Sequence, residues 1–187
     1  GLESERFAHA MGYAISLSAG LWQTRHSSQS MGKQLHTAHA ARLGGEAVQI
    51  AKNGFMAPFE ILEGEQGFFA AMCSDGRPNA VLDDYGEKWL IADVSFKPWP
   101  ACRHAHAAID AALEFFTKKE IPALRGPILL RTYSDALKFC DRPEPNSTIE
   151  AKFSLQHSVA VALHKGGPQL ADFEEEQREN DDIAALR

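Results

Sequence analysis

Apolar and small residues recur at helical spacing through the first half of the chain. One predicted helix runs from about Ser4 to Thr24. Its apolar or small face comprises Phe7, Met11, Ala14, Ile15, Ser18, Leu21 and Trp22. A second predicted helix, His36 to Asn53, is rich in Ala and Gly and precedes Gly54, a residue typical of the position after a helix C-cap. We expect its small side chains to allow close packing against neighbouring helices.

The pattern changes near residue 89. Trp89 to Phe96 carries Ile, Val and aromatic residues at strand-like spacing, and Ile128 to Tyr133 predicts a second strand. An amphipathic helix is expected between them, over residues 105–116. Further helices are expected from Ser134 to about Cys140 and from Phe153 to His164, the latter ended by Gly-Gly-Pro at 166–168.

This order of elements predicts an α+β protein with a domain boundary near Ala92. Residues 1–92 form the helical part, and residues 93–187 form an α+β part that we expect to be incomplete, because two strands do not make a stable sheet alone. The acidic segment from Asp172 to Asp182 is interpreted as a solvated helix or loop.

Composition narrows the possible partners. The 187 residues include 19 Lys and Arg against 25 Asp and Glu, a formal net charge of −6. No apolar run approaches the roughly 20 residues that a membrane-spanning helix needs, and no basic stripe suggests nucleic acid. Three cysteines without a C-x-x-C pair indicate a reducing, cytoplasmic setting. We therefore expect small molecules and other subunits as partners.

Lys33 is the first candidate for chemistry. It lies just before the Ala-rich helix, where its ammonium group and the N–H groups of the helix N-terminus together suit a carboxylate. The alternative is an exposed loop lysine without a ligand. His36 and His39 are one helical turn apart, a spacing compatible with metal ligation, but no third ligand is evident. A structural or loop-orienting role is the favoured interpretation of both.

A second candidate cluster lies where the first predicted strand gives way to a helix. In a helix that begins near residue 101, Arg103, His106 and Asp110 share one face. Asp110 would then orient the His106 imidazole, and Arg103 would pair with an anionic ligand. A surface ion pair between Arg103 and Asp110 explains the spacing equally well. Cys102 lies among cations but has no evident base, so a nucleophilic role is not favoured.

Four segments taken in order resemble one family. They are 31–36 with 40–44, 54–55 with 60–68, 96–110, and 151–154. Their sequences include Met-Gly-Lys-Gln-Leu-His, Ala-Ala-Arg-Leu-Gly and Phe-Lys-Pro-Trp-Pro-Ala-Cys-Arg-His-Ala-His. Together they resemble the MmgE/PrpD family, which includes 2-methylcitrate dehydratase, cis-aconitate decarboxylase and iminodisuccinate epimerase. The chain resembles the middle portion of its longer members.

The resemblance implies part of an all-helical domain followed by most of a smaller, lid-like α+β domain. It implies a cleft between them where small di- or tricarboxylic acids react by general acid/base catalysis, without a metal or cofactor. A cytoplasmic homodimer and a place in propionate catabolism are implied as well. Because other site residues of the family lie in an N-terminal region that this chain lacks, we expect the isolated chain to be inactive.

The resemblance also assigns roles to residues. Lys33 and His106 match positions that line the cleft, so His106 is expected to act as acid or base and Lys33 to hold a substrate carboxylate. His36 and His104, with Arg103, are expected to bind substrate. A tyrosine that some members carry is Phe139 here, which argues against the decarboxylase.

Dehydration of a hydroxy acid such as 2-methylcitrate is the leading expectation. It needs a base for the proton α to a carboxylate, an acid for the departing hydroxyl, and cations for the developing enolate. Epimerisation and decarboxylation begin with related steps and remain open alternatives within the family. A catalytically silent paralogue, or a domain used for binding or assembly, is the alternative from another class.

Overall fold

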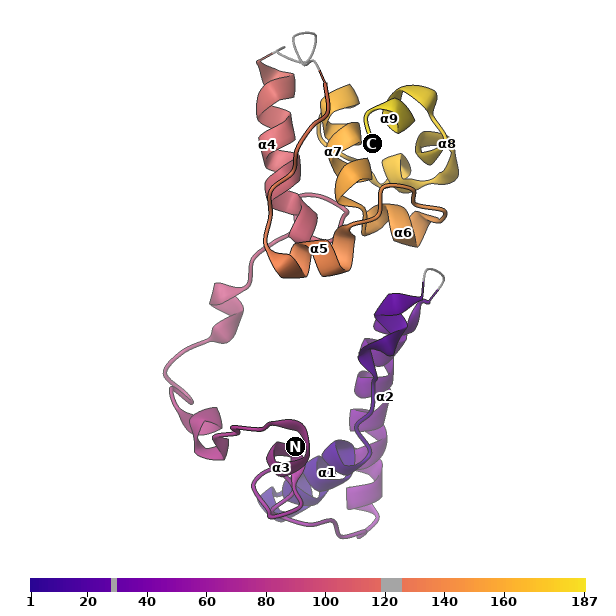
Figure 1. Cartoon of the computed structure of the whole chain (residues 1–187). Coiled ribbons are helices and arrows are strands. Elements are labelled where there is room, and N and C mark those ends of the chain that lie inside the picture. Colours follow the sequence, from indigo (N-terminus) through magenta and orange to yellow (C-terminus); the bar gives the residue numbers. More distant parts are fainter. Residues whose placement is uncertain (28–29, 119–125) are drawn as a thin grey trace. The chain divides into compact units, whose positions relative to one another are not determined.

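The computed structural model describes residues 1–27, 30–118 and 126–187 (Figure 1). By their internal packing these residues divide into two compact units. The first unit comprises Gly1–Thr24 and Met31–Val94, and the second comprises Arg25–Ser30 and Ser95–Arg187. Within the described residues, no helix is both long enough and apolar enough to cross a bilayer.

The first unit is built on two helices that pack against each other, α1 (Ser4–Ser16) and α2 (Gly32–Lys52). Their buried apolar side chains include Ala10, Leu43, Ala47 and Ala51. The small residues of α2 that pack closely are therefore its alanines. Apart from the adjacent residues and the backbone of α2 itself, no described heavy atom lies within 4 Å of a Cβ added at the glycines 44 and 45, so close packing at those two positions is not observed.

Side-chain and backbone contacts hold the segment that follows α2 against α1. His9 is buried, and its Nδ1 lies 2.9 Å from the Ala57 carbonyl oxygen and 3.1 Å from the Ala57 amide nitrogen. A Cβ at Gly12 would approach Ala57 Cβ and the Pro58 carbonyl oxygen to 2.8 Å, so only glycine fits there. The segment after α2 is thus held against α1 over one turn.

The helix predicted to reach Thr24 ends earlier, because α1 stops at Ser16. Gly20 has φ +133°, a conformation that breaks a helix, and a 3-10 helix follows at Trp22–His26. The apolar residues Leu21 and Trp22 are 80% and 66% exposed. Leu21 and Trp22 therefore do not form part of a buried helical face in this unit.

The rest of the first unit has little regular structure. It contains α3 (Phe68–Met72) and 3-10 helices at Pro78–Leu82 and Leu90–Asp93. The strand predicted from Trp89 to Phe96 is wrong, since its centre is the last of these 3-10 helices.

The second predicted strand, Ile128 to Tyr133, is also absent, and the described ranges contain no β-strand. An extended segment becomes a strand only when a neighbour satisfies its backbone hydrogen bonds, and neither segment pairs with another. The structure of the described residues is therefore helical, and the expected α+β lid-like domain is not confirmed.

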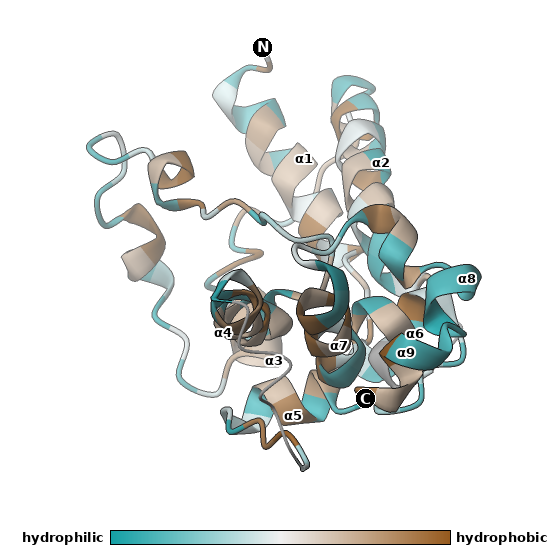
Figure 2. Cartoon of the chain, turned by 90° about the horizontal axis from the view of Figure 1, so that it is seen from above, coloured by the Kyte–Doolittle hydropathy of each residue, from teal (hydrophilic) through white to brown (hydrophobic). Residues whose placement is uncertain are grey.

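The second unit is organised around α4 (His106–Thr117) and α7 (Leu155–Lys165), which pack side by side (Figure 1). Ile109, Leu155 and Phe173 are fully or almost fully buried in their common core. Full burial of such a side chain contributes about 1.5–3 kcal/mol. In Figure 2, brown marks the apolar residues of α4, and teal marks the hydrophilic α8 (Glu175–Arg178), which lies on the other side of α7 in that view.

The shorter helices surround this pair. They are α5 (Ser134–Cys140), α6 (Thr148–Lys152) and α9 (Asp181–Ala185), with a 3-10 helix at Leu170–Phe173. The helices predicted at 105–116, 134–140 and 153–164 are thus confirmed within two residues at each end.

Capping side chains fix where these helices begin. At the start of α7, Ser154 Oγ accepts a hydrogen bond from the His157 amide at 2.9 Å and donates to the Arg142 carbonyl oxygen at 2.6 Å. Asn180 Oδ1 accepts from the amides of Asp182 and Ile183 at the start of α9. Gly166, at φ +95°, ends α7 as the sequence predicts.

The acidic tail is not simply solvated. Phe173 and Ile183 are fully buried, and Asp172 is 1% exposed. The Asp172 carboxylate accepts from Lys165 Nζ at 2.5 Å and from the Gln169 amide at 2.6 Å. The tail is therefore anchored at both ends, because Phe173 lies in the core of the second unit and Ile183, the residue after the tail, packs against Ala160 and Val161 of α7.

A buried histidine joins α7 to this tail. His157 is fully buried, and its Nε2 lies 2.7 Å from the Asp172 carbonyl oxygen, while Nδ1 has no hydrogen-bond partner among the residues that the structure describes. Burial lowers the pKa of His157, although the contact with the Asp172 carbonyl opposes that effect. The positive charges of Arg187 and Arg178 lower it further. The folded state therefore favours the neutral form of the His157 imidazole.

This arrangement predicts acid sensitivity. Because the pKa of His157 is lower in the folded state, its stabilising contribution is complete above the unfolded value of about 6.5 and is lost as the pH falls through the folded value. We expect the melting temperature to fall between about pH 7 and about pH 5. His157→Gln should flatten this dependence, and His164→Gln, at an exposed position of the same helix, should not. Equal slopes in all three proteins would contradict the assignment.

Candidate functional site

Lys33 lies in the first turn of α2, because that helix begins at Gly32 rather than at His36. Its side chain is exposed. His36, one turn further on, is half-buried, and its ring packs against the backbone at Gly20, where an added Cβ would lie 3.3 Å from Nδ1. The first unit therefore places Lys33 and His36 at the same end of α2, with His36 holding the turn that follows α1.

The His36 and His39 pair does not form a metal centre with other described residues. His39 Nδ1 lies 3.4 Å from Arg42 Nη2, one turn along the helix. Within 1–27, 30–118 and 126–187, no group of three His, Cys, Asp or Glu side chains is placed to hold an ion.

The second cluster lies at the start of α4. A 3-10 turn at Arg103–Ala105 leads directly into the helix, whose first residue is His106. His106 is 3% exposed. Its Nδ1 lies 3.3 Å from Arg103 Nη1, and its Nε2 lies 3.4 Å from the Ala101 carbonyl oxygen.

These two contacts define how the His106 ring is held. A guanidinium group can only donate a hydrogen bond and a carbonyl oxygen can only accept one. The ring that satisfies both is neutral, with its proton on Nε2 and its lone pair on Nδ1 directed at Arg103. His106 thus carries an unprotonated nitrogen beside a permanent cation, which suits a base next to an anionic ligand.

Asp110 does not orient His106. Its Oδ1 accepts a hydrogen bond from Trp99 Nε1 at 2.8 Å. Arg103 instead contacts His106 and, through Nη2, donates to Ser95 Oγ at 3.2 Å. The shared helical face suggested by the spacing is lost, because Arg103 lies in the 3-10 turn before the regular helix.

His104 is enclosed by two aromatic rings from the α5 region. It stacks on Phe139, with ring centroids 5.1 Å apart and planes at 18°, and its Nδ1 is hydrogen-bonded to the Tyr133 hydroxyl. Sequence reasoning missed the contact between His104 and Tyr133, because the two residues are 29 positions apart and no periodic pattern links them. Tyr133 therefore supplies a phenol near the cluster, although Phe139 lacks one.

The candidate residues fall into two groups. Lys33 and His36 belong to the first unit, while Arg103, His104 and His106 belong to the second. The structure brings the latter three together around the start of α4.

The geometry predicts the tautomer of His106. Long-range ¹H–¹⁵N NMR correlations at about pH 7 should show Nε2 protonated and Nδ1 unprotonated, because Arg103 donates to Nδ1. Arg103→Met should remove that donor and shift the Nδ1 resonance. Asp110→Asn serves as the matched control and should leave both ring nitrogens unchanged. A proton on Nδ1 in the unmodified protein would contradict this geometry.

Comparisons with known proteins agree with the family resemblance found in the sequence. Residues 1–80 match the MmgE/PrpD N-terminal domain, and residues 99–187 match the MmgE/PrpD C-terminal domain. Human cis-aconitate decarboxylase is 30% identical over 185 residues, which cover 94% of this chain and 37% of that protein. The 2-methylcitrate dehydratase of Salmonella typhimurium is 27% identical over 157 residues, covering 81% of this chain and 32% of that protein.

The chain thus spans about a third of the length of these relatives. The N-terminal domain match precedes the C-terminal one, and together they take in both candidate clusters, Lys33 with His36 and Arg103 with His104 and His106. The chain belongs to the MmgE/PrpD family.

Proposed function

We propose that this chain contributes to a lyase that dehydrates a small hydroxy di- or tricarboxylic acid, such as 2-methylcitrate, by general acid/base catalysis without a metal. The observation that carries the proposal is the buried His106 imidazole, held between the Arg103 guanidinium and the Ala101 carbonyl oxygen. Membership of a family whose named relatives are a dehydratase and a decarboxylase supports the reaction class.

The geometry suggests how substrate would prepare His106 for proton transfer. In the absence of substrate, Arg103 donates to Nδ1 of the ring. A substrate carboxylate is a stronger acceptor for a guanidinium than a neutral imidazole is. When Arg103 turns to the carboxylate, the Nδ1 lone pair becomes available to take the proton α to that carboxylate, and the imidazolium that forms would return a proton to the hydroxyl group, which leaves as water.

The remaining candidates would act on the charges of the substrate. Lys33, exposed on α2, would neutralise a second carboxylate and the charge that develops on the enolate. His36 and His104 would position substrate, His36 from the turn after α1 and His104 from its stack on Phe139. We further propose that the protein acts as a cytoplasmic homodimer.

Decarboxylation of a tricarboxylic acid is the second candidate. The 30% identity to human cis-aconitate decarboxylase favours it, and the Tyr133 hydroxyl at His104 offers a proton donor within the cluster. Phe139, which has no hydroxyl, argues the other way. Reprotonation of the same enolate on its opposite face would make the enzyme an epimerase, and a non-catalytic paralogue would show none of these reactions.

Proton NMR in D₂O distinguishes the outcomes. A full-length protein containing this chain is incubated with 2-methylcitrate, citrate, cis-aconitate and iminodisuccinate. A new alkene signal from a hydroxy acid identifies a dehydratase, loss of a carboxyl group identifies a decarboxylase, and deuterium exchange without elimination identifies an epimerase. No reaction with any of the four would contradict the proposal. We expect the 187-residue chain by itself to be inactive.

Substitutions test the assigned roles. His106→Gln should lower kcat by about 10²- to 10⁴-fold, because it removes the proton-transfer group. Lys33→Ala should also reduce kcat/KM, with part of the loss in KM, because a carboxylate loses its cation. His164→Gln, at an exposed position on α7, is the matched control and should retain activity. Full activity of the His106 variant, with an unchanged melting temperature, would exclude His106 as the acid or base.

A further inference from the structure

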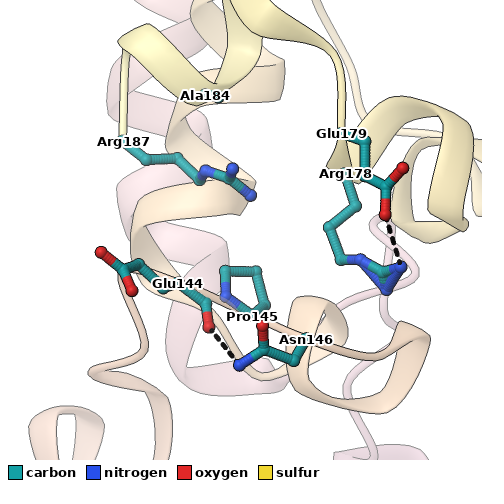
Figure 3. Close-up of a pocket in the computed structure, with 7 residues that line it drawn as sticks. All are labelled: Glu144, Pro145, Asn146, Arg178, Glu179, Ala184 and Arg187. Carbon is teal, nitrogen blue, oxygen red and sulfur yellow. Dashed lines mark hydrogen bonds and ion pairs between the residues drawn. The ribbon is translucent and has the colours of Figure 1, made fainter.

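A pocket in the second unit lies apart from the residues assigned to catalysis. It has a volume of about 340 Å³ and is bordered by the 143–146 loop, α8 and α9 (Figure 3). The lining residues are Glu144, Pro145, Asn146, Arg178, Glu179, Ala184 and Arg187. None of the candidate catalytic or substrate-binding residues is among them.

Two guanidinium groups, those of Arg178 and Arg187, line this pocket. Figure 3 shows Arg187 extending over Pro145 and Arg178 descending from the neighbouring helix. The Arg178 side chain is only 11% exposed. Arg187 Nη1 is buried and has no hydrogen-bond partner among the described residues. A buried donor without a partner costs free energy, so this nitrogen is suited to an acceptor from outside the chain.

The two cations also act on one another. Burial lowers the pKa of Arg187, and the positive charge of Arg178 lowers it further, while Glu144 opposes both effects. Their charges are therefore close enough to repel. An anion between them would relieve the repulsion and supply the missing acceptor at the same time.

The carboxylates of the pocket do not already fill this role. Glu179 Oε1 lies 3.7 Å from Arg178 Nη2, but the Glu179 side chain is 68% exposed, so water screens the pair. Glu144 is exposed as well. Its backbone carbonyl accepts from Asn146 Nδ2 at 3.2 Å, which fixes the loop that forms the floor, and the buried Pro145 adds an apolar surface there.

We propose that this pocket binds a small oxyanion, a carboxylate or a phosphate, between Arg178 and Arg187. The planar guanidinium group presents paired N–H donors that match the two oxygens of such an anion. The volume is sufficient for a small organic acid, and Pro145 provides a contact for its carbon skeleton. The site is independent of the proposed catalytic residues, so it is a second ligand site of the second unit.

The test is an NMR titration of the protein with succinate and, separately, with inorganic phosphate, each at ionic strength held constant with sodium chloride. Binding should shift the amide resonances of Asn146, Glu179 and Ala184. Saturation by succinate alone identifies a carboxylate site, and saturation by phosphate alone identifies a phosphate site. Absence of saturation with both anions would overturn the proposal.

Variants assign the binding to the two arginines. Arg187→Gln and Arg178→Gln should each weaken the anion by about tenfold or more, since each removes a charge-assisted hydrogen bond. Arg187→Lys, which keeps the charge but loses the fork, should retain part of the affinity. Glu144→Gln should tighten binding, because it removes a competing negative charge.

Arg131→Gln is the matched control, an exposed arginine of the same unit outside the pocket, and should leave affinity unchanged. Circular dichroism and melting curves without anion identify any variant that fails to fold, and Arg187→Lys and Glu144→Gln then still test the site. Unchanged affinity in both glutamine variants of the arginines, or a loss equal to that of Arg131→Gln, would show that the anion binds elsewhere.

Discussion

The packing of α4 on α7 is the contact on which the second unit depends. Ile109 from α4 and Leu155 from α7 meet in one buried core, and Phe173 from the acidic tail completes it. Ser154 ties this core to the loop before α6, because its hydroxyl caps α7 and donates to the Arg142 carbonyl. The position of α4 fixes the turn that precedes it, and that turn carries Arg103, His104 and His106.

The same packing explains why polar groups are buried beside apolar ones. His106 is the first residue of α4, so its ring enters the unit at the edge of the core and finds its partners in the backbone of Ala101 and the side chain of Arg103. His157 is buried in α7, and its Nε2 contacts the Asp172 carbonyl oxygen. His106 contacts the Arg103 guanidinium, whereas His157 contacts the Asp172 carbonyl oxygen. The two buried imidazoles are therefore suited to different chemistry.

Much of the helical structure could be predicted, and the reasons are local. Helix α5 begins at Ser134 and ends at Cys140 as its pattern indicates, and Gly166 ends α7 because it adopts a positive φ. The strand predictions failed because alternation describes side-chain exposure, whereas a strand requires a hydrogen-bonded neighbour that neither segment has. The acidic tail is exposed at most of its positions, as its charges indicate, but the pattern does not reveal that Asp172 and Phe173 at its start are buried.

The sequence by itself determined the family, the positions of the candidate residues and, within two residues, the bounds of α4, α5 and α7, because short-range spacing and linear motifs carry that information. It did not determine which groups meet. The partner of His104 is Tyr133, 29 residues away, and Asp110 bonds to Trp99 rather than to His106. Hydrogen bonds between distant residues depend on the turn before α4 and on core packing, so only the tertiary structure decides them.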